Sequence, residues 1–318
     1  MALSAQRVVI VLMKVRESIA IDIPDSDLKS SYQWWPEMHW AILRVSKSSY
    51  TDWRWCRRQY GIKRVLRVRE PPTDDMTRGS NVHDAVDDFY ANFDMKAALA
   101  AKSEGYGQVL SYFLKQIPDS NSERGMHELG EYEHLRRFMT VEARRFMDAE
   151  TEHFLPSGNE VGLDAIVEID GVMVHINGFV DRIFSDANGN LHIHELKTGA
   201  WKENKYKREA MRQEMAFYAY LIKHCEHPIF GGKDATFWGW DHTGGREIFR
   251  GRETVRVKEI TSMYEGLREI VAKHKQYRGG TDISMFQTLP KEKIERLCTP
   301  WCRVKGFCSH FGEVLMYE

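Results

Sequence analysis

The chain has 318 residues, of which 42% are hydrophobic and 29% are charged, a composition typical of globular proteins and unlike that of disordered or fibrous chains. Its formal net charge at pH 7 is −1, so the overall charge does not indicate binding to a polyanion, and any such contact must come from local patches. The apolar run Val8–Met13 is short and is followed directly by Lys14, so we expect no transmembrane helix, no membrane partner and no signal peptide.

The cysteines are few and unevenly placed. There are five, an odd number that argues against a disulfide framework and for a reducing, cytoplasmic location. Cys56 lies early and Cys225 in the middle, whereas Cys298, Cys302 and Cys308 are crowded near the end of the chain. This crowding predicts a metal site.

The first half of the chain is predicted to be mainly helical. Residues 49–69 have the pattern of a helix that begins at a hydroxyl residue and runs into a short apolar strand or a helix extension. In residues 79–116, apolar side chains recur at three- and four-residue steps, which indicates a helical region. Residues 118–130 are polar and contain glycine, so we expect a loop. A further amphipathic helix is expected around residues 135–147.

The second half is predicted to be rich in strands. The first three apolar runs are separated by Asp-Gly and Asn-Gly turn signals. The expected strands are 163–169, 172–183, 191–196, 235–240 and 247–257, and the expected helices are 205–224 and 260–277. This order predicts an α/β or α+β fold in which helices flank a mixed central sheet.

Two carboxylates and a lysine gather at the end of a predicted hairpin. Asp181 lies on one strand, and Glu195 and Lys197 lie on the next, beyond a tight turn. Neighbouring strands can bring the two carboxylates together, and residues two apart on a strand share a face. Such a pair with an ammonium group beside it suits a hard cation held by oxygen ligands, with Lys197 positioned to orient a water molecule or to stabilise a phosphoryl oxygen.

The bare Glu-x-Lys pattern also occurs by chance. A second copy, Glu203 to Lys205, lies in a charged stretch that is typical of a solvated turn. The first copy differs because it ends an apolar β run opposite Asp181. Two carboxylates held close together inside a sheet are costly unless a cation neutralises them.

Asp181, Glu195 and Lys197, followed by Thr-Gly, resemble the core of the PD-(D/E)XK nuclease superfamily in its RecB-like branch. That branch also carries a histidine after Arg-Gly on an early helix, as at His83. Its first helix contains a cysteine followed by basic and aromatic residues, as in Ser49 to Tyr60. The resemblance covers roughly residues 46–312. Some relatives carry an extra carboxylate where this chain has Glu150, Glu152 and Asp164, and the sequence does not choose among them.

The resemblance implies a restriction-endonuclease-like fold with a helical N-terminal part and a C-terminal cysteine-rich region. It implies Mg²⁺ or Mn²⁺ as the catalytic metal, at a site formed by His83, Asp181, Glu195 and Leu196. It also implies a catalytic role for Lys197.

The family places Gln-x-x-x-Tyr on the helix after the catalytic strand, and this chain departs from that pattern. Gln213 is followed four positions later by Phe217, whereas Glu214 stands four positions before Tyr218. Either Gln213 or Glu214 can therefore occupy the family's position. We include Gln213 and Tyr218 among the catalytic candidates.

Cys298, Cys302 and Cys308 with the remote Cys56 resemble the iron-sulfur branch of these nucleases, which includes CRISPR-associated Cas-four-type exonucleases and AddB-like helicase-nucleases. The resemblance implies a structural [4Fe-4S] cluster, since four thiolates are its usual ligand set. Structural Zn²⁺ is the alternative, because His310 could complete a Cys-Cys-Cys-His set. Cys56 would then be an ordinary buried thiol, and Cys225 is a core thiol in either case.

Basic and aromatic residues interleave in residues 53–69, 201–212 and 246–258. Such stretches can neutralise phosphates and stack on unpaired bases, as a track for single-stranded DNA requires. Solvated helix faces and core aromatics are the alternative for most of these residues. Trp201 is the strongest stacking candidate, because it follows Lys197 in an expected loop.

We therefore expect residues 46–318 to form a metal-dependent DNA exonuclease domain behind an N-terminal extension, residues 1–45. The expected substrates are single-stranded DNA or DNA ends, and a recombination or CRISPR-adaptation protein is a possible partner. One alternative is a DNA-binding or scaffold subunit that keeps the cluster but cleaves little. A zinc-containing regulatory protein is another, but it would leave the carboxylate pair unexplained.

Overall fold

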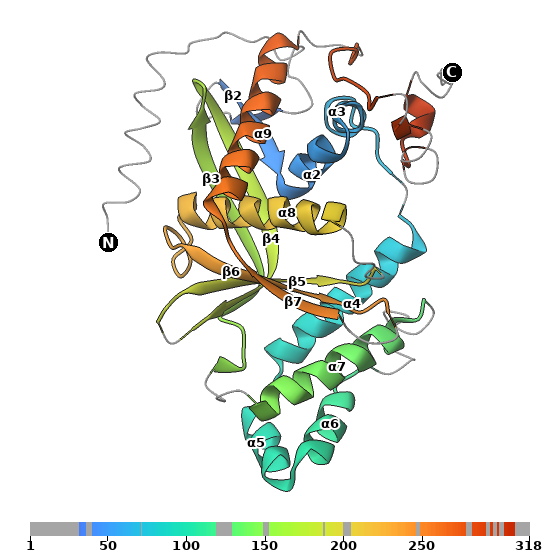
Figure 1. Cartoon of the computed structure of the whole chain (residues 1–318), viewed down its shortest axis with the longest axis vertical. Coiled ribbons are helices and arrows are strands. Elements are labelled where there is room, and N and C mark those ends of the chain that lie inside the picture. The colour runs from blue at the N-terminus through green and yellow to red at the C-terminus, as the bar shows by residue number, and fades with distance from the viewer. Residues whose placement is uncertain are drawn as a thin grey trace. The chain divides into compact units, whose positions relative to one another are not determined.

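The computed structural model describes residues 32–35, 40–70, 72–118, 129–148, 153–186, 188–199, 205–245, 249–277, 282–290, 293–294, 298 and 302–308 (Figure 1). The chain divides into two compact units. The first comprises Met1–Glu70, Ile166–Asn177 and Tyr264–Glu318, and the second comprises Pro71–Ala165 and Gly178–Met263.

In the first unit, a short stretch of sheet leads into a broken helix. Strand β1 (Tyr32–Trp35) is antiparallel to β2 (Trp40–Ser46), and the end of β2 is parallel to the first half of β4 (Val172–Ser185). Helix α2 (Lys47–Trp55) follows directly, and Ser46 caps it by accepting a hydrogen bond from Ser49 N at 3.1 Å.

The helix predicted at the start of residues 49–69 is interrupted at Cys56. This residue has an extended backbone (φ −160°, ψ 121°) and separates α2 from α3 (Arg57–Tyr60), which continues into the π-helical turn η2 (Gly61–Val65). Aromatic packing holds the segment in place, because Trp53 and Tyr60 meet edge to face. The interruption matters because it presents the Cys56 side chain at the helix junction.

In the second unit, a mixed sheet positions the carboxylates. The second half of β4 is antiparallel to β5 (Leu191–Lys197), β5 is parallel to β6 (Ala235–His242), and β6 is antiparallel to β7 (Phe249–Thr254). Strand β3 (Gly158–Ile169) pairs with β4. Helix α8 (Lys205–His224) packs against β5 and β6. The predicted α/β fold, a mixed sheet flanked by helices, is confirmed.

The helical region predicted over residues 79–116 consists of three helices. These are α4 (Asp74–Ala91), α5 (Met95–Glu104) and α6 (Tyr106–Leu114). Asp94 caps the second helix through Ala97 N, and Gly105, at φ 104°, separates the second from the third. The periodicity predicted the helices but missed these two boundaries.

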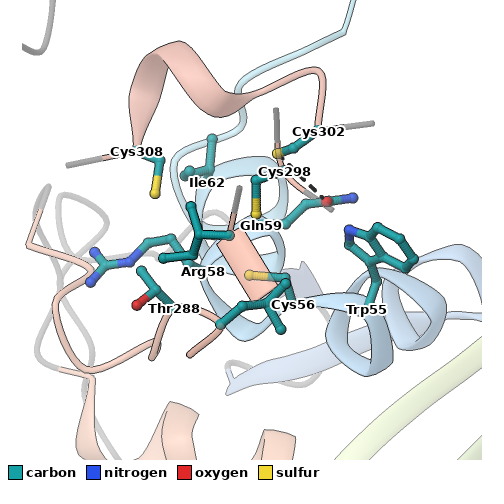
Figure 2. A pocket seen from close by; sticks show the side chains of 11 residues that line it. Trp55, Cys56, Arg58, Gln59, Ile62, Thr288, Cys298, Cys302 and Cys308 are labelled. Atoms are coloured by element: carbon teal, nitrogen blue, oxygen red, sulfur yellow. Dashed lines mark hydrogen bonds between the residues drawn. The ribbon is translucent and has the colours of Figure 1, made fainter. Parts of the chain in front are cut away.

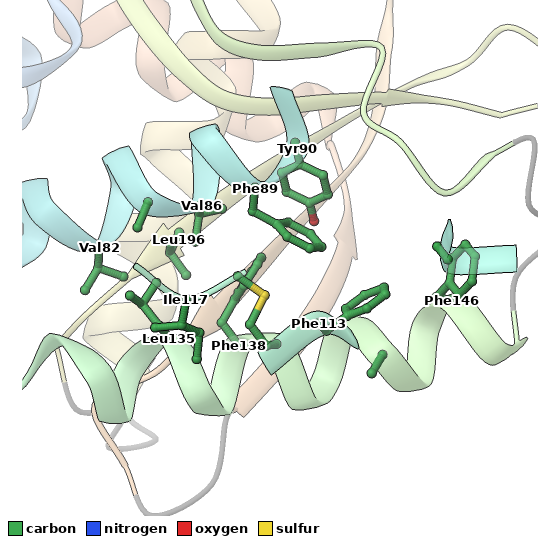
Figure 3. Close-up of a cluster of buried hydrophobic side chains, with 14 of the residues drawn as sticks. Val82, Val86, Phe89, Tyr90, Phe113, Ile117, Leu135, Phe138, Phe146 and Leu196 are labelled. Carbon is green, nitrogen blue, oxygen red and sulfur yellow. The ribbon is translucent and has the colours of Figure 1, made fainter. Parts of the chain in front are cut away.

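Helix α7 (Glu131–Asp148) closes an aromatic core with the three preceding helices (Figure 3). Phe113 is fully buried, and its ring contacts those of Phe89, Phe146 and Phe154. Leu196 of β5 reaches the same core. The core therefore fixes the position of the strand that carries Glu195 and Lys197.

The remaining described elements are α9 (Val257–Gln276) and the short turn η5 (Lys305–Phe307). Among the helices that the structure describes, none has both the length and the apolar composition to cross a membrane. The loop expected at residues 118–130 lies mostly outside the described residues.

Candidate metal and nuclease site

The β4–β5 hairpin brings Asp181 to the start of the Glu195-Leu196-Lys197 segment. Arg182 lies opposite His194 in the register, and the Asp181 carboxylate accepts a hydrogen bond from Leu196 N at 2.6 Å. Asp181 is partly exposed, whereas Glu195 is buried at 1% exposure. The hairpin alone therefore sets two carboxylates at one end of the sheet.

His83 joins this site from α4. Its Nε2 lies 3.1 Å from the Leu196 carbonyl oxygen, and its Nδ1 lies 3.6 Å from Asp181 Oδ2. Burial lowers the pKa of His83, but hydrogen bonding to Glu160 and the charges of Asp181 and Glu195 outweigh it, so the pKa lies above its ordinary value. The imidazole is thus surrounded by oxygen atoms of the kind that hold hard cations.

Glu160, at the start of β3, adds a carboxylate that the sequence did not single out. Its Oε1 lies 3.5 Å from His83 Nδ1. One ligand atom from each of His83, Glu160 and Asp181 lies within 4.8 Å of the others, a grouping that could hold a metal ion. Glu160 has a left-handed backbone (φ 44°), a conformation that costs a non-glycine residue about 1–3 kcal/mol and is common at functional sites.

Asp87 adds a further carboxyl group beside the grouping of His83, Glu160 and Asp181. It lies one helical turn after His83, and burial together with the charge of Glu160 raises its pKa to about 7. A carboxyl group that resists ionisation at neutral pH indicates that negative charge outweighs positive charge around it. A divalent cation would supply that charge, so these residues fit the metal.

Lys197 is held between two carboxylates. Its ammonium group donates to Glu195 at 2.6 Å and to Glu214 of α8 at 3.1 Å. Burial lowers the pKa of Lys197, but the charges of Glu195, Glu214 and Asp181 raise it well above its ordinary value. Without a bound metal, Lys197 is therefore protonated at neutral pH and can donate hydrogen bonds.

Helix α8 also carries the two other predicted residues, and it places them differently. The Tyr218 hydroxyl donates to the Phe179 carbonyl oxygen beside the site. The buried Gln213 donates to Glu209 on the same helix at 3.3 Å. Glu214, rather than Gln213, is the residue that contacts Lys197.

Hydrogen bonds with Thr243, which follows β6 in the chain, hold the end of β5 in place. Thr243 N donates to the Lys197 carbonyl oxygen at 3.0 Å, and the Thr243 hydroxyl is hydrogen-bonded to His134 Nδ1 at 2.7 Å. Arg137 donates to the Thr243 carbonyl oxygen at 2.7 Å. These contacts anchor the backbone on which the lysine stands.

The first unit contains a second cluster of metal-ligand residues. Cys56, Cys298, Cys302 and Cys308 line one small pocket, together with Gln59 and other side chains (Figure 2). Burial raises the pKa of the Cys302 thiol to about 11, and the neighbouring thiols contribute to this shift. Thiolates are the ligands of iron and zinc centres, so four cysteines that line one pocket fit a four-thiolate metal centre.

Much of the positive charge in the stretches considered for DNA binding is already paired. Lys63 and Arg64 both contact Asp52, at 2.7 Å and 2.5 Å, and Arg212 contacts Glu253 at 2.7 Å. Among the residues of these stretches whose side chains the structure describes, the exposed aromatics are Trp55, at 40%, and Tyr206, at 72%.

Several residues considered from the sequence lie outside the described part of the chain. They are Trp201, Glu203, His310, Glu150 and Glu152. Asp164, also considered as an extra carboxylate, lies on β3 and is exposed.

A sequence model of the PD-(D/E)XK nuclease superfamily matches residues 44–309. The chain belongs to this superfamily, whose members are nucleases that use divalent metals such as Mg²⁺ or Mn²⁺, with DNA as the substrate that the family implies. No curated protein matches the chain in sequence.

Solved structures also resemble the chain, among them the following two. The crystal structure of SSO0001 shares 12% identity at a TM-score of 0.40 and covers 97% of this chain and 98% of its own. A "putative exonuclease" from Eubacterium rectale shares 14% identity at a TM-score of 0.41 and covers 73% of this chain and 80% of its own. At these TM-scores the likenesses carry no argument about function.

Proposed function

We propose that the protein is a metal-dependent DNA exonuclease of the RecB-like branch. It would act on single-stranded DNA or frayed ends during recombination, repair or the processing of CRISPR or phage DNA. The observation that carries the proposal is the grouping of His83, Glu160 and Asp181 beside a lysine that is held by Glu195.

The residues of the site would have different roles in phosphodiester hydrolysis, and the first role is to bind metal. His83, Asp181, Glu195, Glu160 and the Leu196 carbonyl would hold one or two divalent ions. When bound, such an ion lowers the pKa of its water and offsets charge on the scissile phosphate.

The protonated Lys197 would donate to the attacking water or to a phosphate oxygen, and thereby stabilise the charge that develops in the transition state. Glu214 would fix the position of the ammonium group. Tyr218, through its hydrogen bond to the Phe179 carbonyl, would hold α8 against β4.

The preference for unpaired DNA rests on exposed aromatic side chains. Tyr206 lies in the first turn of α8, eight residues before Glu214, and most of its side chain is exposed. Stacking on an aromatic ring is worth about 1–3 kcal/mol per base, so single strands or frayed ends would bind better than blunt duplex.

We propose that the four cysteines ligate a structural [4Fe-4S] cluster in a cytoplasmic protein. Because Cys56 lines the same pocket as the C-terminal triplet, a four-thiolate set is favoured over the zinc set completed by His310. The cluster would join residues far apart in the sequence.

The test is a nuclease assay on end-labelled linear strands and closed circles, with Mg²⁺, Mn²⁺ or EDTA. We expect the unaltered protein to cleave linear DNA and EDTA to abolish this cleavage. The variants Asp181→Asn, Glu195→Gln and Lys197→Met should not cleave. Asp164→Asn, on the neighbouring strand, is the control and should stay active. Equal rates on circles and linear DNA would indicate an endonuclease instead. Metal-independent binding without any cleavage would favour a scaffold subunit.

A further inference from the structure

A second cavity lies in the second unit, away from the metal ligands. It has a volume of about 390 Å³, within the range of small-molecule sites. His192 and His194 of β5 line it. They alternate with Ile193 and Glu195 along the strand, so they face the opposite side of the sheet from Glu195.

Arg182 is the unusual feature of this cavity. It is one of the lining residues and is only 1% exposed. Its Nε, Nη1 and Nη2 are buried, and none has a hydrogen-bond partner in the part of the chain that the structure describes. Asp241 Oδ2 lies 3.8 Å from Nη2, beyond hydrogen-bond range. Buried guanidinium donors without acceptors are costly, and an acceptor supplied by a bound water or a ligand would remove that cost.

A second guanidinium group stands over the same cavity. Arg252 lies 4.2 Å from the centroid of the Phe237 ring, and within the described ranges no carboxylate is in ion-pair contact with it. An arginine stacked in this way keeps its N–H groups available at the edge of its plane. Two guanidinium groups, those of Arg182 and Arg252, therefore line the same cavity.

The carboxylates that line the cavity are already engaged. Glu142 accepts hydrogen bonds from Tyr90 at 2.8 Å and from Arg145 at 2.6 Å. Asp186 accepts from Asn188 N and Asn190 N, both at 2.9 Å, within the β4–β5 turn. Among the described residues, neither carboxylate forms a hydrogen bond or an ion pair with Arg182 or Arg252, so an anion can approach the two guanidinium groups.

The rest of the lining suits a flat ring. Phe184, Phe237 and Trp238 line the cavity, and the His192 and His194 rings lie edge-on to Phe237 and Phe184. Guanidinium groups bind phosphate with directed hydrogen bonds, and aromatic side chains stack on nucleobases. We propose that this cavity binds a nucleoside monophosphate, with its phosphate at Arg182 and Arg252 and its base among the aromatic side chains.

Calorimetric titration of the full chain in EDTA tests the assignment. We expect deoxyadenosine monophosphate to bind more tightly than either deoxyadenosine or inorganic phosphate. A short 5′-phosphorylated oligonucleotide in a parallel titration distinguishes a free nucleotide from the end of a strand. If only the oligonucleotide binds, the source is a strand end; if the monophosphate binds at least as well, it is a free nucleotide.

Arg252→Gln is the informative variant, because this exposed residue can change without opening the core. We expect it to weaken monophosphate binding by about tenfold or more, since a charge-assisted contact is lost. Arg136→Gln, at an exposed position of α7, is the matched control and should bind normally. Three results would each overturn the proposal. Arg252→Gln could bind the monophosphate as tightly as the unaltered protein does, deoxyadenosine could bind as tightly as its monophosphate, or neither the monophosphate nor the oligonucleotide could bind at all.

The test is independent of the nuclease proposal. Asp181→Asn should bind the monophosphate like the unaltered protein, because Asp181 does not line the cavity. Loss of cleavage with retained binding would separate the two sites.

Discussion

Glu214 accepts a hydrogen bond from Lys197 at 3.1 Å, and Glu195 accepts a second one from the same ammonium group at 2.6 Å. Helix α8 thereby places a carboxylate against Lys197, at one of the two positions that can match the amide of the family pattern. The lysine has two anionic partners, which both fix its position and keep it protonated.

Glu214→Leu should lower the rate of cleavage by about tenfold to hundredfold, the usual effect of losing a group that orients another. Glu214→Gln should retain most of the rate, because its carbonyl oxygen can still accept from Lys197. Single-turnover assays with saturating metal would measure both.

Gln213→Leu provides the comparison, since Gln213 donates to Glu209. We expect a smaller loss than for Glu214→Leu. If Gln213→Leu lost more of the cleavage rate than Glu214→Leu, Gln213 would be the residue that matches the family's glutamine.

The sequence predicted the hairpin and its residues well because they depend on local signals. The turn between β4 and β5 and the alternation along both strands are sufficient to place Asp181 near Glu195 and Lys197. The bounds of α8 were also predicted correctly, since its amphipathic pattern is uninterrupted.

The sequence could not select Glu160 or choose between Gln213 and Glu214. Glu160 reaches the site because β3 pairs with β4 and because its backbone is left-handed, and neither feature has a sequence signal. Adjacent helical residues differ by about 100° in direction, so the register of α8 against β5 decides which one faces Lys197. Asp87 could have been found, because it lies one turn after His83.

Glu160→Gln should weaken the binding of Mn²⁺ by about tenfold or more, since the variant loses a charged candidate ligand. The measurement is calorimetric titration of the metal-free protein. Asp164→Asn, four residues along the same strand and exposed, is the control. Unchanged affinity in Glu160→Gln would remove this residue from the metal site.

Asp87 should make the metal-free protein less stable as the pH rises. Its folded-state pKa of about 7 lies above the ordinary value of 3.8, so the unfolded chain loses this proton first. Stability falls between about pH 4 and pH 7 and stays reduced above that. In EDTA, Asp87→Asn should therefore raise the melting temperature at pH 8 but not at pH 4. A gain of equal size at both pH values would show that ionisation is not the cause.

The aromatic core should be intolerant of truncation. Phe113→Ala removes a fully buried ring that contacts Phe89, Phe146 and Phe154, and it should lower the free energy of unfolding by about 3–5 kcal/mol. Urea denaturation would measure the loss. Leu99→Ala, at a position that is 43% exposed, should change stability much less, and an equal loss would contradict the assigned core.

Cys56→Ala tests the metal centre of the first unit. Cys56 sits where the backbone interrupts the helix between α2 and α3, and it lines the pocket of Cys298, Cys302 and Cys308. A centre that forms only in the folded chain stabilises that chain. Anaerobically purified protein should therefore be brown, and Cys56→Ala should lose both the iron-thiolate absorbance and several degrees of melting temperature. Cys225→Ala, a buried thiol in the second unit, should keep its colour. A colourless protein with one zinc, unaffected by Cys56→Ala but disrupted by His310→Ala, would replace the cluster with a zinc site and leave the nuclease site unchanged.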